Sequence, residues 1–85
     1  MSHWKVYGKD DCEYCDKAID LIEKLGDSYE KVWITPDNRS SVISELTELI
    51  GKTPRTVPQI FRDGEYAGDY DEVFSLLEGT EGYLI

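Results

Sequence analysis

The chain reads WKVYGKDDCEYCDKAIDLIEKLG from residue 4 to residue 26. The first part, residues 4–7, is short, aromatic and β-branched and stops at Gly8, which predicts a strand. In the second part, apolar side chains recur at three- and four-residue spacing before Gly26, which predicts an amphipathic helix over residues 13–25. The apolar stripe of that helix consists of Cys15, Ala18, Ile19, Ile22 and Leu25. A strand that leads into a helix, with a Cys-x-x-Cys pair at the junction, is the feature on which the fold prediction depends.

The next elements complete a predicted βαβ unit. Residues 29–34 predict a second strand, parallel to the first, because Pro36 biases the residue before it toward an extended conformation. Asp37 or Asn38 can cap a second helix that ends at Gly51. The expected buried stripe of this helix is Val42, Ile43, Leu46, Leu49 and Ile50.

A hairpin and a third helix follow. Asp63-Gly64-Glu65 lies between the runs 58–62 and 66–67, which predicts two antiparallel strands joined by a tight turn. Residues 69–71 can cap a last helix, whose apolar members are Val73, Phe74, Leu76 and Leu77. The Gly-rich tail, residues 79–85, is expected to fray. The order β-α-β-α-β-β-α predicts a thioredoxin-like α/β fold, with a mixed four-stranded sheet flanked by three helices.

Length and charge exclude several classes of function. With 85 residues the chain suffices for one core, so residues 1–85 are expected to form a single domain. The 18 acidic and 9 basic residues give a net charge of −9, which repels nucleic-acid phosphates and anionic membrane surfaces. No apolar run approaches the roughly 20 residues needed to cross a bilayer, and the first residues lack the apolar stretch of a secretion signal. We therefore expect a cytoplasmic protein without nucleic-acid or membrane partners.

The two cysteines are expected to carry the chemistry. Cys12 lies where the strand gives way to the helix, so unpaired N–H groups and the helix dipole favour its thiolate. Cys15 follows one turn later on the same face, at a Cα separation of roughly 5–6 Å that a disulfide can bridge. Because Cys15 also belongs to the apolar stripe, it should be the more buried thiol. It suits a resolving role, with Cys12 as the attacking nucleophile.

Other interpretations of the pair stay open at this point. Both cysteines could be ordinary buried apolar residues. A structural zinc site needs about four ligands, and His3 is the only other typical soft ligand, so no metal is expected within one chain. An iron–sulfur cluster shared by two chains, with added thiol ligands, is a further alternative.

Four motifs extend over nearly the whole chain. They are Lys9-Asp10-Asp11-Cys12-Glu13-Tyr14-Cys15, Arg55-Thr56-Val57-Pro58, Phe61-Arg62-Asp63-Gly64 and Ala67-Gly68-Asp69-Tyr70-Asp71. In these motifs and in their order the chain resembles the glutaredoxins. The combination of Cys-x-x-Cys with Thr-Val-Pro and a late Gly-x-x-Asp is more specific than Cys-x-x-Cys alone.

The resemblance implies a glutathione site around Cys12. Thr56 and Val57 would offer their backbone to the extended tripeptide, with the peptide bond before Pro58 in the cis form. Lys9 would approach the thiolate and the glycine carboxylate of glutathione, and Tyr14 would flank the cleft with its ring. For Lys9, a solvated surface position is the alternative.

The start of the last helix would hold the other end of glutathione. Gly68, Asp69 and Tyr70 would bind the γ-glutamyl carboxylate through free N–H groups, as helix N-termini bind anions. Asp71 would meet the ammonium group of the same residue. Simple helix capping is the alternative role for Asp69 and Asp71.

The resemblance also implies the function. We expect a thiol–disulfide oxidoreductase that reduces protein disulfides and glutathione mixed disulfides through Cys12 and Cys15, with glutathione as co-substrate and no tightly bound cofactor. Ribonucleotide reductase is a family-type protein acceptor, and a monomer is expected. Two alternatives stay open: a glutaredoxin-like redoxin reduced by thioredoxin reductase, and a module that binds an iron–sulfur cluster through Cys12 and glutathione. Lys9 and Asp71 favour glutathione over thioredoxin reductase, because both would serve the glutathione site.

Overall fold

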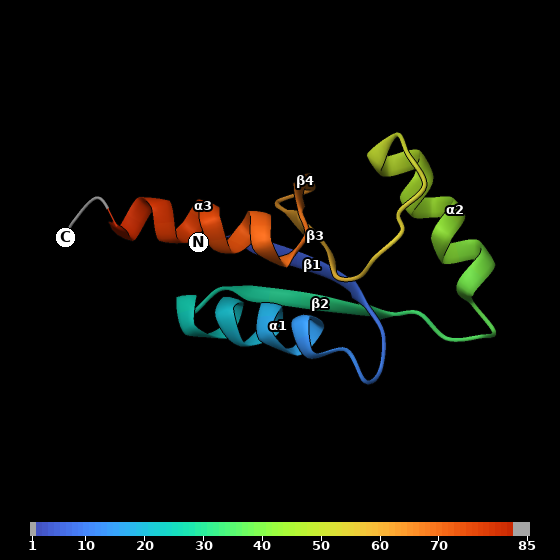
Figure 1. Ribbon diagram of the computed structural model, residues 1–85, viewed down its shortest axis with the longest axis horizontal. Helices are drawn as coiled ribbons and strands as arrows, with labels where there is room; N and C mark the ends of the chain where they lie inside the picture. Colours follow the sequence, from blue (N-terminus) through green and yellow to red (C-terminus); the bar gives the residue numbers. More distant parts are fainter. Residues whose placement is uncertain (1, 83–85) are drawn as a thin grey trace.

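The computed structural model describes residues 2–82, and its elements follow the predicted order (Figure 1). The strands and helices are β1 (His3–Gly8), α1 (Glu13–Leu25), β2 (Ser28–Trp33), α2 (Arg39–Ile50), β3 (Gln59–Arg62), β4 (Glu65–Gly68) and α3 (Tyr70–Gly82). The apolar spacing predicts the bounds of α1 correctly. Gly26 ends this helix with a φ of 78°, a left-handed conformation in which its N–H donates to the carbonyl O of Glu23.

The four strands form one mixed sheet in the order β2-β1-β3-β4. β1 is parallel to β2 because α1 carries the chain back between them, and β3 is antiparallel to both β1 and β4. The β3–β4 hairpin turns at Asp63 and Gly64, which have φ values of 51° and 86°. This sheet and the three helices confirm the predicted thioredoxin-like fold.

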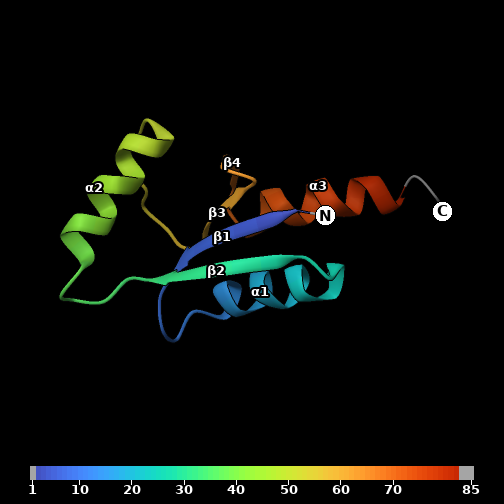
Figure 2. The same ribbon diagram turned by 180° about the vertical axis from the view of Figure 1, so that it is seen from behind.

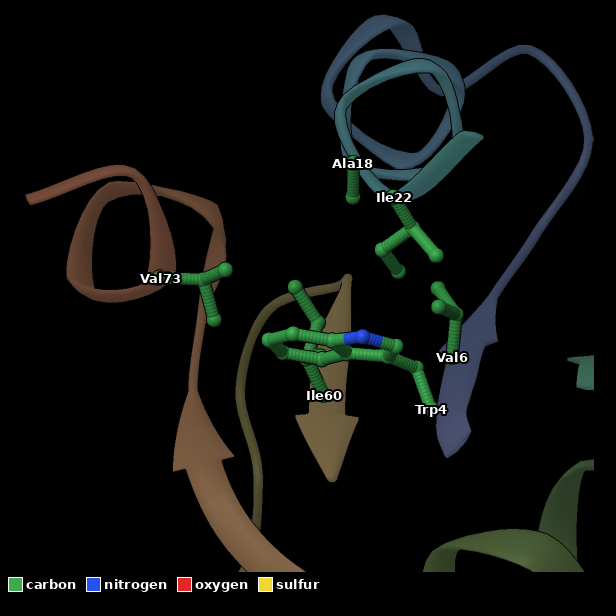
Figure 3. Close-up of a cluster of buried hydrophobic side chains, with 6 residues drawn as sticks. All are labelled: Trp4, Val6, Ala18, Ile22, Ile60 and Val73. Carbon is green, nitrogen blue, oxygen red and sulfur yellow. The ribbon is translucent and has the colours of Figure 1, made fainter. Parts of the chain in front are cut away.

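The larger core lies between the sheet and the helices α1 and α3. Trp4 and Val6 alternate along β1 with Lys5 and Tyr7 and therefore point to the same face of the sheet. Six fully buried side chains from β1, α1, β3 and α3 meet there (Figure 3): Trp4, Val6, Ala18, Ile22, Ile60 and Val73. Trp4 Nε1 donates to a carboxylate oxygen of Asp27 at 2.9 Å. This layer fixes α1, and with it the cysteine pair, beside the sheet.

α2 packs on the other face of the sheet through a narrow contact. Figures 1 and 2 show it well apart from α1 and α3. Leu46 is the only buried residue of α2, and it packs on Tyr7 and Phe61. Tyr7 also donates a hydrogen bond from its hydroxyl to Glu45 Oε2 at 2.8 Å. Burial, followed by this carboxylate, raises the pKa of Tyr7.

Two expectations for α2 are wrong. Leu49 is 55% exposed rather than buried. α2 contacts the sheet through one row of residues spaced by four, Val42, Leu46 and Ile50, and Leu49 lies beside that row. Asn38 precedes the helix, but its side chain does not cap it. Instead, Asn38 Oδ1 accepts from the N–H of Thr35 at 2.7 Å, so the side chain stabilises the turn before α2.

α3 is longer than the sequence predicts. The helix continues to Gly82, so residues 79–82, which the sequence assigns to the tail, belong to α3. Glycine ends a helix when it adopts a left-handed conformation, as Gly51 does at the end of α2 with a φ of 87°, whereas Gly79 lies within α3. The rest of the predicted tail, residues 83–85, lies outside the described residues. Within residues 2–82, no helix combines the length and apolar character needed to span a membrane.

Candidate active site

The cysteine pair lies between β1 and α1, as predicted, and is oxidised to a disulfide with a Cα–Cα distance of 5.2 Å. Cys12 is the residue immediately before α1, and its Sγ accepts a hydrogen bond from the N–H of Cys15 at 3.2 Å. The Cys12 side chain is partly exposed, whereas Cys15 is fully buried. Cys12 is therefore the more accessible sulfur, and a helix N-terminus directed at it favours negative charge on this sulfur in the dithiol state.

Gly8 lies directly behind the inner cysteine. An ideal Cβ built on Gly8 would lie 2.8 Å from Cys15 Sγ and 2.9 Å from Cζ3 of Trp33, closer than side-chain atoms normally approach. The buried sulfur of Cys15 therefore occupies space that a side chain at position 8 would take. The sequence pattern identifies Gly8 only as the end of a strand and does not show this role.

The segment before β3 lies opposite the pair. The Val57–Pro58 peptide bond is cis, as the family resemblance implies, and Pro58 is fully buried. The carbonyl O of Val57 lies 3.9 Å from Cys12 Sγ. Behind this segment the buried side chain of Gln59 donates to the carbonyl O of Thr56 at 2.7 Å. Gln59 also accepts a hydrogen bond from the Tyr66 hydroxyl, and no pattern in the sequence indicates this support.

A cleft of about 270 Å³ opens between this segment and the start of α3. All seven of its lining residues belong to the predicted site: Tyr14, Thr56, Val57, Pro58, Asp69, Tyr70 and Asp71. The rings of Tyr14 and Tyr70 lie 5.5 Å apart, so aromatic side chains from α1 and α3 border the cleft together.

The start of α3 is only partly available to a ligand. Glu72 donates its N–H to Asp69 Oδ1 at 2.9 Å, and Glu72 Oε1 accepts from the N–H of Asp69 at 3.4 Å, which is a capping box. The capping alternative therefore holds for Asp69, and the N–H of Asp69 is not free. In the part of the chain that the structure describes, the N–H groups of Tyr70 and Asp71 have no protein acceptor, and the Asp71 carboxylate has no partner.

Two other predicted residues lie outside the cleft. Gly68, with a φ of 108°, lies behind the start of α3, where an added Cβ would approach the Glu72 carboxylate. Lys9 is exposed and lines a neighbouring hollow of about 470 Å³, which we call the groove, between α2 and residues 54–57. No cluster of three or more His, Cys, Asp or Glu side chains suited to a metal ion occurs among residues 2–82.

Comparison with known proteins identifies the family. A family model described as glutaredoxin matches residues 5–67. This chain belongs to the glutaredoxin family. Glutaredoxin 3 of Escherichia coli K12 is 33% identical over 76 residues, which cover 89% of this chain and 87% of the relative. Glutaredoxin-C6 of Oryza sativa is 32% identical over 81 residues, covering 94% of this chain and 69% of the relative.

Solved glutaredoxin structures have the same fold. Glutaredoxin 1 from Francisella tularensis, in complex with cacodylate, superposes with a TM-score of 0.80 at 25% identity, covering 96% of this chain and 99% of that chain. A buckwheat glutaredoxin–glutathione complex superposes with a TM-score of 0.73 at 28% identity, covering 89% and 69%. As a glutaredoxin, the protein is a thiol–disulfide oxidoreductase, and Cys12 and Cys15 form its redox pair.

Proposed function

We propose that this glutaredoxin uses glutathione as its co-substrate and reduces protein disulfides and glutathione mixed disulfides. The observation that carries the proposal is the cleft. At one end it is lined by Val57, whose carbonyl O lies 3.9 Å from Cys12 Sγ, and at the other end by the exposed Asp71 and the free N–H groups at the start of α3. A ligand in this cleft can reach the Cys12 sulfur at one end. At the other end, N–H groups can bind an α-carboxylate, and the Asp71 carboxylate can bind an α-ammonium group.

Glutathione fits this arrangement with its cysteine sulfur at Cys12. The γ-glutamyl carboxylate would accept from the N–H groups of Tyr70 and Asp71, and its ammonium group would donate to the Asp71 carboxylate. The backbone of Val57 would pair with the extended tripeptide, beside the ring of Tyr14. Lys9 would meet the glycine carboxylate from the side of the groove. The buckwheat glutaredoxin of the same fold is a complex with glutathione, which supports glutathione as the ligand of this cleft.

The reaction consists of two thiol–disulfide exchanges. The Cys12 thiolate attacks one sulfur of the substrate disulfide, forms a mixed disulfide and releases the other sulfur as a thiolate, which takes up a proton. Cys15 then attacks the Cys12 sulfur of the mixed disulfide and releases the second thiol. The enzyme is left as the Cys12–Cys15 disulfide, and two molecules of glutathione return it to the dithiol and become glutathione disulfide. Alternatively, a second glutathione resolves the mixed disulfide in place of Cys15.

The proposal extends to partners and location. Cytoplasm is the fitting compartment, since its glutathione pool keeps thiols reduced. Ribonucleotide reductase is a candidate protein acceptor, because its reaction forms a disulfide that must be reduced in each cycle. We propose that the protein acts as a monomer, since the cleft and the cysteine pair come from one chain.

The electron source is the decisive test. We expect turnover of a glutathione mixed disulfide with NADPH, glutathione and glutathione reductase, and little turnover with NADPH and thioredoxin reductase. NADPH oxidation at 340 nm measures both reactions under the same conditions. Efficient reduction by thioredoxin reductase alone would refute glutathione dependence and establish the redoxin alternative.

Asp71→Ala is expected to weaken the use of glutathione specifically. Loss of a charge-assisted contact to the ammonium group corresponds to roughly 1.5–3 kcal/mol, so kcat/KM for a glutathione mixed disulfide should fall at least about tenfold. Turnover of bis(2-hydroxyethyl) disulfide with dithiothreitol as reductant should change little. Glu48→Ala, which removes the same charge from an exposed position on α2, is the matched control. An equal loss on both substrates would contradict the assignment.

A further inference from the structure

The groove between α2 and residues 54–57 has a lining that the proposed glutathione site does not explain. Its apolar part consists of Ile34, Pro36, Ile43, Leu46, Pro54 and Val57. In Figure 1 the chain returns along α2 after this helix ends and then reaches β3, and the returning segment supplies Pro54 and Val57 to the groove. The groove is larger than the cleft, at about 470 Å³ against 270 Å³, and of its lining residues only Lys9, Thr56 and Val57 have a proposed contact with glutathione.

The charged residues of the groove are all of one sign. Lys9, Arg39 and Arg55 line it, and no acidic residue does, although the whole chain has 18 acidic and only 9 basic residues. All three side chains are exposed. The ion pairs found within residues 2–82, Lys17–Glu13 and Lys24–Asp20, lie on α1 and leave these three cations unpaired. Unpaired cations over an apolar floor match a ligand that has carboxylates next to apolar groups.

The groove is continuous with the reaction centre. Thr56 and Val57 line both the groove and the cleft, and the carbonyl O of Val57 lies 3.9 Å from Cys12 Sγ. A polypeptide that is joined to Cys12 through its own cysteine can therefore extend into the groove with the residues that flank this cysteine.

We propose that the groove binds the segment of a protein substrate that flanks its disulfide, and that it selects segments with an acidic residue beside an apolar one. The proposal rests on the disulfide-reducing function and specifies which protein disulfides this glutaredoxin prefers. The apolar side chain of the segment packs on Ile43 and Pro54, while its carboxylate pairs with Arg39 and Arg55. Glutathione, held in the cleft, does not need Arg39.

The net charge of the protein and the charge of the groove predict opposite preferences for charged peptides, so an experiment can distinguish them. A net charge of −9 by itself attracts basic peptides and repels acidic ones. The groove predicts the reverse order, because contacts at the site act at short range, where salt screens them least. A preference for an acidic peptide therefore cannot arise from the overall field of the protein.

The experiment compares two synthetic peptides with an internal disulfide and identical sequences except for Glu-Leu or Lys-Leu after the second cysteine. Reduced protein is mixed with each peptide without glutathione, the reaction is stopped with acid, and the rate constant for one turnover is measured by chromatography. We expect the Glu-Leu peptide to be reduced about fivefold faster, as a locally screened ion pair allows. Arg39→Glu should abolish or invert this preference.

Lys24→Glu is the matched control, since it changes the net charge equally at an exposed position on α1 and should retain the preference. Circular dichroism verifies that both variants fold. Equal rates of the wild-type protein on both peptides, or equal effects of Arg39→Glu and Lys24→Glu, would overturn the proposal. So would a loss of glutathione mixed disulfide turnover in Arg39→Glu, which would assign Arg39 to the glutathione site. Because the peptide reaction contains no glutathione, failure of the glutathione proposal would be seen separately, in the NADPH-coupled assay.

Discussion

Cys12→Ser is expected to abolish all thiol transfer, whereas Cys15→Ser is expected to retain turnover of a glutathione mixed disulfide. The two sulfurs differ in access: Cys12 is partly exposed beside the cleft, and Cys15 is fully buried behind Gly8. Without Cys12, the remaining thiol cannot reach an external disulfide. Without Cys15, a second glutathione can still release the product from Cys12.

The measurement is the steady-state rate of both single variants on a glutathione mixed disulfide and on a protein disulfide. We expect Cys15→Ser to lose activity mainly on the protein disulfide, where the resolving thiol must release the trapped substrate. Mass spectrometry of Cys15→Ser should find the substrate bound to Cys12. An inactive Cys15→Ser together with an active Cys12→Ser would reverse the assignment of the two roles.

Gly8→Ala is expected to destabilise the protein and to slow the closure of the Cys12–Cys15 disulfide. The added methyl group would lie 2.8 Å from Cys15 Sγ and 2.9 Å from Trp33, so at least one of them must move. Overpacking of a buried site commonly lowers the free energy of unfolding by about 1–3 kcal/mol. The added methyl group would displace the Cys15 sulfur, which is the sulfur that resolves the mixed disulfide. The mixed disulfide on Cys12 should therefore persist longer than in the wild-type protein.

Thermal unfolding and the lifetime of the mixed disulfide with glutathione, followed by mass spectrometry, measure the two effects. Gly26→Ala separates them: the φ of 78° makes alanine unfavourable there, yet nothing lies within 4 Å of the added Cβ. This control should lower stability without changing the lifetime of the mixed disulfide. If both variants changed the lifetime equally, Gly8 would have only a general structural role.

The sequence predicts best the features that depend on local patterns. The apolar stripe of α1 and the stop at Gly26 define that helix to the residue, and the hairpin follows from Asp63-Gly64. All residues that line the cleft belong to the motifs around Tyr14, Thr56 and Asp71, which become neighbours as soon as the order of strands is known, whereas Lys9 and Gly68 lie outside it.

Features that depend on contacts between distant segments were missed. Gly8 has the pattern of a strand end, and nothing local shows that Cys15 and Trp33 approach it from two other elements. The sequence offers capping as an alternative role for Asp69, and its partner Glu72 could have been found from the spacing of the two residues. The exposed position of Leu49 could not have been found in the sequence, because it depends on how few residues of α2 contact the sheet.

The weak attachment of α2 has a consequence for how the molecule moves. α1 anchors itself with three buried side chains, Cys15, Ala18 and Ile22, whereas α2 has Leu46 alone. Segments with few buried contacts open locally at a lower free energy than the rest of a fold. The outer wall of the groove is therefore the helix that can shift or unfold while the cysteine pair stays in place. One rigid reaction centre can thus accept substrate segments of different bulk, at the entropic cost of ordering α2 around each of them.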